Sequence, residues 1–135
     1  MTRFALSGLV ALVLLLAGTA SATAASTIFR SPAGGGIECA IGAVDATCYS
    51  DATLDRPFGN PQGCGSDASA AKVAARGRAR WTEVCNPFFA TRSLAVGRTV
   101  GVGKVACRSL RTGVKCWSRA SKRGFVITPA RVRFL

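Results

Sequence analysis

Residues 107–116 read Cys-Arg-Ser-Leu-Arg-Thr-Gly-Val-Lys-Cys, and residues 39–48 read Cys-Ala-Ile-Gly-Ala-Val-Asp-Ala-Thr-Cys. In both stretches eight residues separate the cysteines, and the turn-prone residues between them include Gly113 and Gly42. The aliphatic residues two positions before each cysteine are Ile37, Ala46, Val105 and Val114. This pattern predicts two antiparallel hairpins with facing cysteines. Facing Cα atoms in such a ladder lie about 4.5–5.5 Å apart, which suits a disulfide.

The six cysteines are therefore predicted to form three bridges, Cys39–Cys48, Cys107–Cys116 and, by elimination, Cys64–Cys85. Six cysteines allow 15 pairings, among which the sequence alone does not choose. An even cysteine number in a small exported chain is typical of a disulfide framework. No metal site is predicted, because the chain has no His and the cysteines lack the close spacing of zinc ligands.

The N-terminus has the pattern of a secretory signal peptide. The short basic segment Met1-Thr2-Arg3 is followed by an apolar run to Ala17, and Ala22-Thr23-Ala24 matches the cleavage pattern of signal peptidase. We expect residues 1–24 to be removed, with cleavage after Ala25 as the alternative. The product would be a secreted or cell-envelope protein, since the apolar run is shorter than the ~20 residues of a membrane-spanning helix.

The mature chain, residues 25–135, is short enough for one domain and is expected to be a monomer. Short apolar alternations predict an all-β or β-rich fold, a small antiparallel sheet domain stapled by disulfides. These alternations are Ile37, Cys39 and Ile41, then Val44, Ala46 and Cys48, and finally Val132 and Phe134. Residues 55–67 have the composition of a loop. Residues 66–76 are expected to form one short helix that Gly77 would end; the alternative is that residues 72–76 form a strand that enters a turn.

Charge is distributed unevenly along the chain. Lys and Arg number 18 against 6 acidic residues, for a net charge of +12. Residues 72–135 hold fifteen of these cations and one acidic residue, Glu83. We expect this half to attract an anionic partner, either a cell-envelope polymer or lipid headgroups. The alternative is a charge pattern that only improves solubility. Genomic nucleic acid is not expected as a ligand, because aromatic residues are few and export would separate the two.

The most suggestive basic segment alternates Arg76, Arg78 and Arg80 and continues with Trp81. On a strand, the three guanidinium groups would lie on one face and Trp81 on the other. On a helix, only Arg76 and Arg80 would align. Further cations cluster around the second hairpin and could extend the same surface. The predicted anion-binding residues are Arg76, Arg78, Arg80, Trp81, Arg108, Arg111, Lys115, Arg119, Lys122 and Arg123.

No catalytic residue and no cofactor are predicted. Residues 101–106 match a short dinucleotide-binding pattern, but no acidic residue follows them, so a turn before a strand is the better interpretation. The six carboxylates are scattered, whereas carboxylate catalysis needs two at one site or one in an apolar pocket. Two other functions remain open: a secreted inhibitor or effector that binds a partner protein, and a hydrolase that uses Glu38 or Glu83.

Residues 29–39, Phe-Arg-Ser-Pro-Ala-Gly-Gly-Gly-Ile-Glu-Cys, resemble the opening F-x-S-P-S-G-N-I-x-C of a family of small exported bacterial proteins of unknown function. The later stretches 96–97, 107–109, 113–116 and 124–127 resemble its closing block, so the resemblance covers residues 28–135. This chain differs in its Ala-Gly-Gly-Gly turn and lacks the family's Trp-Gly and Gly-Asp-Thr segments. The resemblance implies a secreted, disulfide-containing, mostly β domain and implies no activity.

Overall fold

The computed structural model describes residues 26–50, 69–84 and 90–135, and these residues form an all-β fold without a helix. The leader, the loop at 55–67 and the predicted Cys64–Cys85 bridge lie outside the described residues. The strands are β1 (Thr27–Arg30), β2 (Glu38–Ile41), β3 (Asp45–Tyr49), β4 (Ser69–Ala74), β5 (Arg80–Glu83), β6 (Thr99–Val102), β7 (Val105–Leu110), β8 (Gly113–Ser118), β9 (Gly124–Ile127) and β10 (Val132–Phe134).

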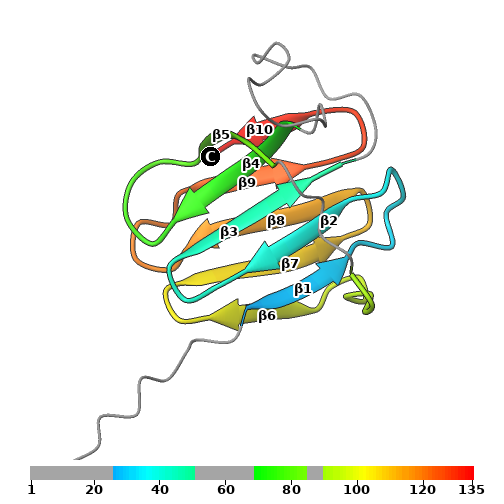
Figure 1. Cartoon of the computed structure of the whole chain (residues 1–135), viewed down its shortest axis with the longest axis horizontal. Helices are drawn as coiled ribbons and strands as arrows, with labels where there is room; N and C mark the ends of the chain where they lie inside the picture. The colour runs from blue at the N-terminus through cyan, green and yellow to red at the C-terminus, as the bar shows by residue number, and fades with distance from the viewer. Residues whose placement is uncertain (1–25, 51–68, 85–89) are drawn as a thin grey trace, which may run out of the picture.

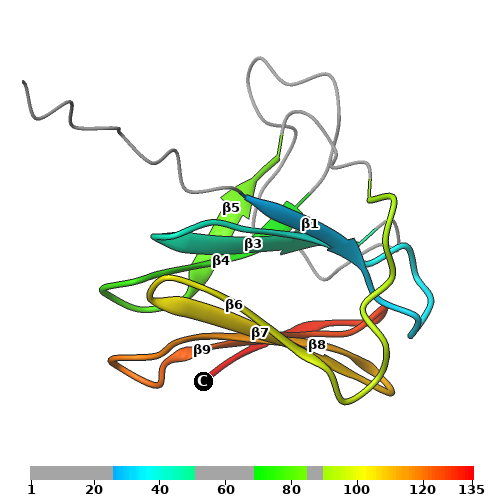
Figure 2. The same ribbon diagram turned by 90° about the horizontal axis from the view of Figure 1, so that it is seen from below.

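The strands form two five-stranded antiparallel sheets, each with its strands in chain order. Strands β1 to β5 make the first sheet and β6 to β10 the second, and the two stack face to face as the layers seen in Figure 2. The two sheets have the same strand arrangement, and in each a disulfide joins the second strand to the third. The chain is therefore a β-sandwich of two meanders.

The two bridges lie where the hairpin spacing predicts them. Cys39 pairs with Cys48, and Cys107 with Cys116, and in each pair the Cα atoms are 4.1 Å apart at facing register positions. All four side chains are fully buried between the sheets. The bridges also touch each other, because the Sγ atoms of Cys48 and Cys116 are 3.6 Å apart. The disulfides thus form the centre of the core.

Around the disulfides, alternate side chains of each strand point inward, as the period-two pattern predicts. Ile37, Ile41 and Ala46 are fully buried on the first sheet, and Val114, Phe125 and Ile127 on the second. Val44 departs from the predicted pattern and is 65% exposed. It lies in the turn between β2 and β3, where the chain no longer follows the strand alternation.

The expected helix at 66–76 is wrong over its described part, where residues 69–74 form β4. The alternative interpretation, a strand that enters a turn, is the one the structure shows, but the strand begins at residue 69 and ends at residue 74. Ala70, Ala71 and Val73 are fully buried in the sheet. Alanine favours helices intrinsically, but here pairing with β3 and burial of these small side chains outweigh that preference. Gly77 lies in the turn that follows, with a positive φ of 97°.

The open edges of the sandwich are closed by contacts outside the ladders. At one edge, the rings of Trp81 on β5 and Phe134 on β10 meet edge to face, with centroids 5.7 Å apart. At the other, Arg30 on β1 exchanges backbone hydrogen bonds with Arg92 and Leu94. The ring contact joins the two sheets, and the segment at residues 92–94 covers part of the edge strand β1.

Candidate anion-binding surface

In a meander every second turn lies at the same end of the sheet, and four turns meet at one end of this sandwich, on the left of Figure 1. Backbone hydrogen bonds join them. The Ala75 N–H donates to the Val44 carbonyl at 2.6 Å, the Lys104 N–H to Ala43 at 3.2 Å, and the Arg119 N–H to Lys104 at 2.9 Å. We call this surface, made of residues 42–44, 75–79, 103–104 and 119–123, the basic end.

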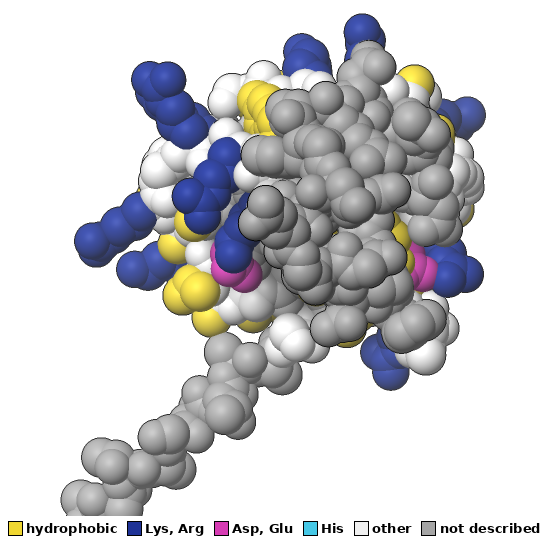
Figure 3. All heavy atoms as spheres, turned by 45° about the horizontal axis from the view of Figure 1, so that its top comes forward, with side chains coloured by type: hydrophobic (Ala, Val, Ile, Leu, Met, Phe, Trp, Pro, Cys, Tyr) yellow, Lys and Arg dark blue, Asp and Glu magenta, His cyan; other side chains and the backbone are white. Residues whose placement is uncertain are grey.

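Three of the four turns carry exposed cations. These are Arg76, Arg78, Lys104, Arg119, Lys122 and Arg123. Lys and Arg side chains project along the left of the space-filling view, which is the side of these turns (Figure 3). Since the turns are hydrogen-bonded to one another, the fold holds six positive charges from distant parts of the chain on one surface.

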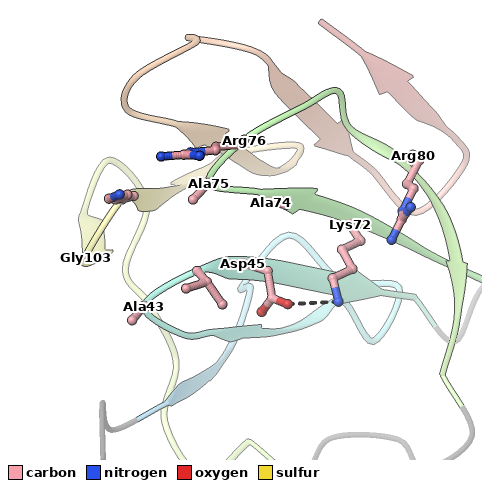
Figure 4. Close-up of a pocket in the computed structure, with 10 residues that line it drawn as sticks. Ala43, Asp45, Lys72, Ala74, Ala75, Arg76, Arg80 and Gly103 are labelled. Atoms are coloured by element: carbon pink, nitrogen blue, oxygen red, sulfur yellow. Dashed lines mark ion pairs between the residues drawn. The ribbon is translucent and has the colours of Figure 1, made fainter. Parts of the chain in front are cut away.

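An open hollow of about 630 Å³ lies beside the basic end, on the outer face of the first sheet (Figure 4). Its charged lining residues are Asp45, Lys72, Arg76, Arg80 and Lys104. Asp45 is the one acidic residue among them, and its Oδ2 lies 2.8 Å from the Lys72 Nζ. Lys72 and Arg80 are facing residues of β4 and β5, and like charges that face each other across a ladder repel. An anion in the hollow would relieve that repulsion.

The three predicted arginines do not share one strand or one helix. Arg76 and Arg78 lie on either side of Gly77 in the turn, and only Arg80 lies in a strand. All three are nevertheless exposed at or beside the basic end. Trp81 lies on the opposite face of β5 from Arg80, as predicted, and packs on the core and against Phe134.

The remaining predicted cations divide into three groups. Arg119, Lys122 and Arg123 belong to the basic end. Arg108 and Lys115 are facing residues on β7 and β8, on the outer face of the second sheet. Arg111 lies in the turn between β7 and β8, which is at the opposite end of the sandwich. Because of Arg111, the predicted set is not one continuous surface.

Two cations of the site, Lys72 and Lys104, are absent from the predicted set. Lys104 follows Gly103 in the turn before β7, whereas residues 101–102 end β6 and residues 105–106 begin β7, so the predicted turn before a strand is limited to residues 103–104. Gly103 has a positive φ of 56°, and a Cβ there would lie 2.6 Å from the Ala43 carbonyl oxygen. This glycine lets the two sheets' turns approach each other closely. The close approach brings Lys104 to the basic end.

Glu38, the residue considered for a hydrolase, is 4% exposed and has partners on both carboxylate oxygens. The Arg30 Nε donates to Oε1 at 2.9 Å, Arg30 Nη2 also donates to Oε1, and the Tyr49 hydroxyl donates to Oε2 at 2.9 Å. These bonds tie β1, β2 and β3 together on the outer face. The side chain of Glu83 lies outside what the structure describes.

The Sγ atoms of Cys39, Cys48 and Cys116 lie within 4.8 Å of one another, a spacing that could suit a metal ion. All three are oxidised in disulfides, however, and metals bind the thiolate form. The cluster is therefore the contact between two bridges. In the ranges that the structure describes, there is no helix of the length and apolarity needed to cross a membrane.

Fold and surface together define a small disulfide-bonded β-sandwich with a basic end. Comparison with known protein families, with curated proteins and with solved structures finds no match to this chain. Its function is therefore inferred from its own residues.

Proposed function

We propose that this protein is an exported binding module for anionic polymers of the cell envelope, which it holds through the basic end. The observation that carries the proposal is the gathering of six exposed cations from three hydrogen-bonded turns. Asp45, the nearest described acidic residue, already pairs with Lys72. The positive field of this end is thus little compensated within the described chain, and a polyanion would bind it by release of counterions.

Export is part of the proposal. Two disulfides are typical of proteins that fold in an oxidising compartment, and the predicted signal peptide would deliver the chain there. The resemblance to a family of small exported bacterial proteins supports the same location. A cell envelope is rich in polymers that carry phosphate or carboxylate groups. Anionic lipid headgroups carry the same charge, so they are the alternative ligand at this site.

The test is binding of the purified protein to inorganic polyphosphate over a series of salt concentrations. The variant Arg76→Gln/Lys122→Gln/Arg123→Gln removes three of the six cations. The matched control, Arg98→Gln/Arg111→Gln/Arg131→Gln, removes three cations that are also exposed but lie at the opposite end. Both variants lose the same net charge, so a difference between them reports the position of the charge.

We expect the wild-type affinity to fall steeply with salt, and the slope of log Kd against log salt to decrease by about half in the basic-end variant. The control should keep nearly the wild-type slope. Equal losses in the two variants would mean that only net charge matters, and would refute a site at the basic end. Binding to anionic vesicles but not to polyphosphate would favour lipid headgroups as the ligand.

A further inference from the structure

The outer face of the second sheet adjoins the basic end through strand β8. Lys115, Trp117 and Arg119 alternate along this strand and its turn, so their side chains lie on the same outer face. Lys115 and Trp117 are partly exposed and Arg119 is exposed. Because Arg119 also belongs to the basic end, the face and the end form one continuous surface.

The residues that pair with Trp117 across the sheet are small. Trp117 faces Ala106 on β7 and Gly124 on β9, and Ala106 in turn faces Gly101 on β6. The Arg119 guanidinium lies on Gly101, since a Cβ there would be 1.7 Å from Nη2. Ala106 is 2% exposed and Gly124 is buried, so this row presents the partly exposed indole of Trp117 and the Arg119 guanidinium that lies over Gly101.

The next row is cationic. Arg108 faces Lys115, and Arg133 lies in the same row beyond Val126. The Lys115 Nζ is 5.6 Å from the centre of the Trp117 ring. Facing like charges cost stability, and the acidic side chains that the structure describes, those of Glu38 and Asp45, belong to the other sheet. No described acidic side chain of this sheet offsets the repulsion, so a bound anionic group would relieve it.

We propose that this face binds an acidic polysaccharide, with one sugar ring against Trp117 and its acid groups paired with Lys115, Arg108 or Arg119. The inference rests on the proposed function, because it specifies which polyanion the exported protein holds. A sugar offers an apolar ring face for the indole and negative charge for the flanking cations. Single-stranded nucleic acid is less well matched, since it stacks on several aromatic residues and this face presents one among its described residues.

The experiment compares alginate, a polymer of sugar acids, with inorganic polyphosphate, which has no rings. We expect Trp117→Ala to weaken alginate binding about tenfold, which corresponds to about 1.4 kcal/mol, and to leave polyphosphate binding within about twofold of wild type. Trp117→Tyr, which keeps an aromatic ring, should restore most of the alginate affinity. The basic-end variant Arg76→Gln/Lys122→Gln/Arg123→Gln should weaken both.

A second readout does not depend on how well the Trp117→Ala variant folds. The chain has two tryptophans, so Trp81→Phe leaves Trp117 as the only indole fluorophore. In this variant, saturating alginate should shift or quench the emission, and polyphosphate should do so much less. An unchanged emission at saturating alginate, or equal effects of Trp117→Ala on both polymers, would refute the polysaccharide site.

The failures of the two proposals are distinguishable. Polyphosphate binding without alginate binding would overturn this inference and leave the basic end intact as a polyanion site. Absence of binding to either polymer would overturn the proposed function itself. Single-stranded DNA that binds more tightly than alginate, with loss on Trp117→Ala, would replace the polysaccharide with a nucleic acid.

Discussion

Removal of either disulfide should destabilise the fold by a similar and large amount. In both hairpins the bridged cysteines are 9 positions apart, with Cα atoms 4.1 Å apart, and all four sulfurs are buried. A closed loop of about ten residues corresponds to about 2.7 kcal/mol of lost unfolded-state entropy. Deletion of two buried sulfurs adds about 1–2 kcal/mol of lost packing. We therefore expect each loss to cost about 4 kcal/mol, a large part of the 5–15 kcal/mol typical of a domain.

The assay is thermal unfolding, followed by circular dichroism, of wild type and two variants. One is Cys39→Ala/Cys48→Ala, and the other is Cys107→Ala/Cys116→Ala. At about 4 °C per kcal/mol, each variant should lose about 15 °C in Tm. Because the two bridges lie at equivalent positions and touch at 3.6 Å, the two losses should agree within about 1 kcal/mol. A loss below about 5 °C in either variant, or one loss more than twice the other, would refute this reasoning.

Three further substitutions test particular contacts, each by chemical denaturation. Glu38→Ala removes the acceptor of the Tyr49 hydroxyl and should lower the free energy of unfolding by about 2 kcal/mol. An unchanged stability would mean that the hydrogen bonds of Glu38 do not stabilise the fold. Ser109→Ala removes a buried hydroxyl that has no hydrogen-bond partner, and it should leave the stability unchanged or raise it by up to about 1 kcal/mol, whereas a clear loss would reveal a partner. Gly103→Ala places a Cβ at a position with positive φ, 2.6 Å from the Ala43 carbonyl oxygen. It should lower the free energy of unfolding by about 2 kcal/mol and weaken polyphosphate binding. Unchanged stability and binding would contradict the close approach of the two turns.

Much of the fold is predictable because two cysteine hairpins dominate it. A spacing of eight residues, with apolar residues in phase with the cysteines, fits facing strands and fits no helix. Strand β4 is harder to predict, because its alanines favour a helix when taken alone. Its pairing with β3 and β5 and its place in the core decide the outcome, and these contacts come from residues far away in the sequence.

The site is less predictable than the fold, since it depends on which turns share an end. Arg76 and Arg123 are 47 positions apart in the chain, and the meander brings their turns together. Arg111 is much closer in sequence to Arg119, yet it lies at the opposite end because one strand separates their turns. Lys104 illustrates the same point, since its role follows from the contact of Gly103 with Ala43 across the two sheets.

The most direct test of the basic end is a titration of the ¹⁵N-labelled protein with inorganic polyphosphate, followed by NMR of the backbone amides. We predict that the amides of residues 42–44, 75–79, 103–104 and 119–123 shift together, with one affinity, and return to their free positions at high salt. The amides of the opposite turns, residues 97–98, 111–112 and 128–131, should stay in place. Shifts concentrated in those opposite turns, or spread evenly over all exposed arginines, would contradict an anion site at the basic end.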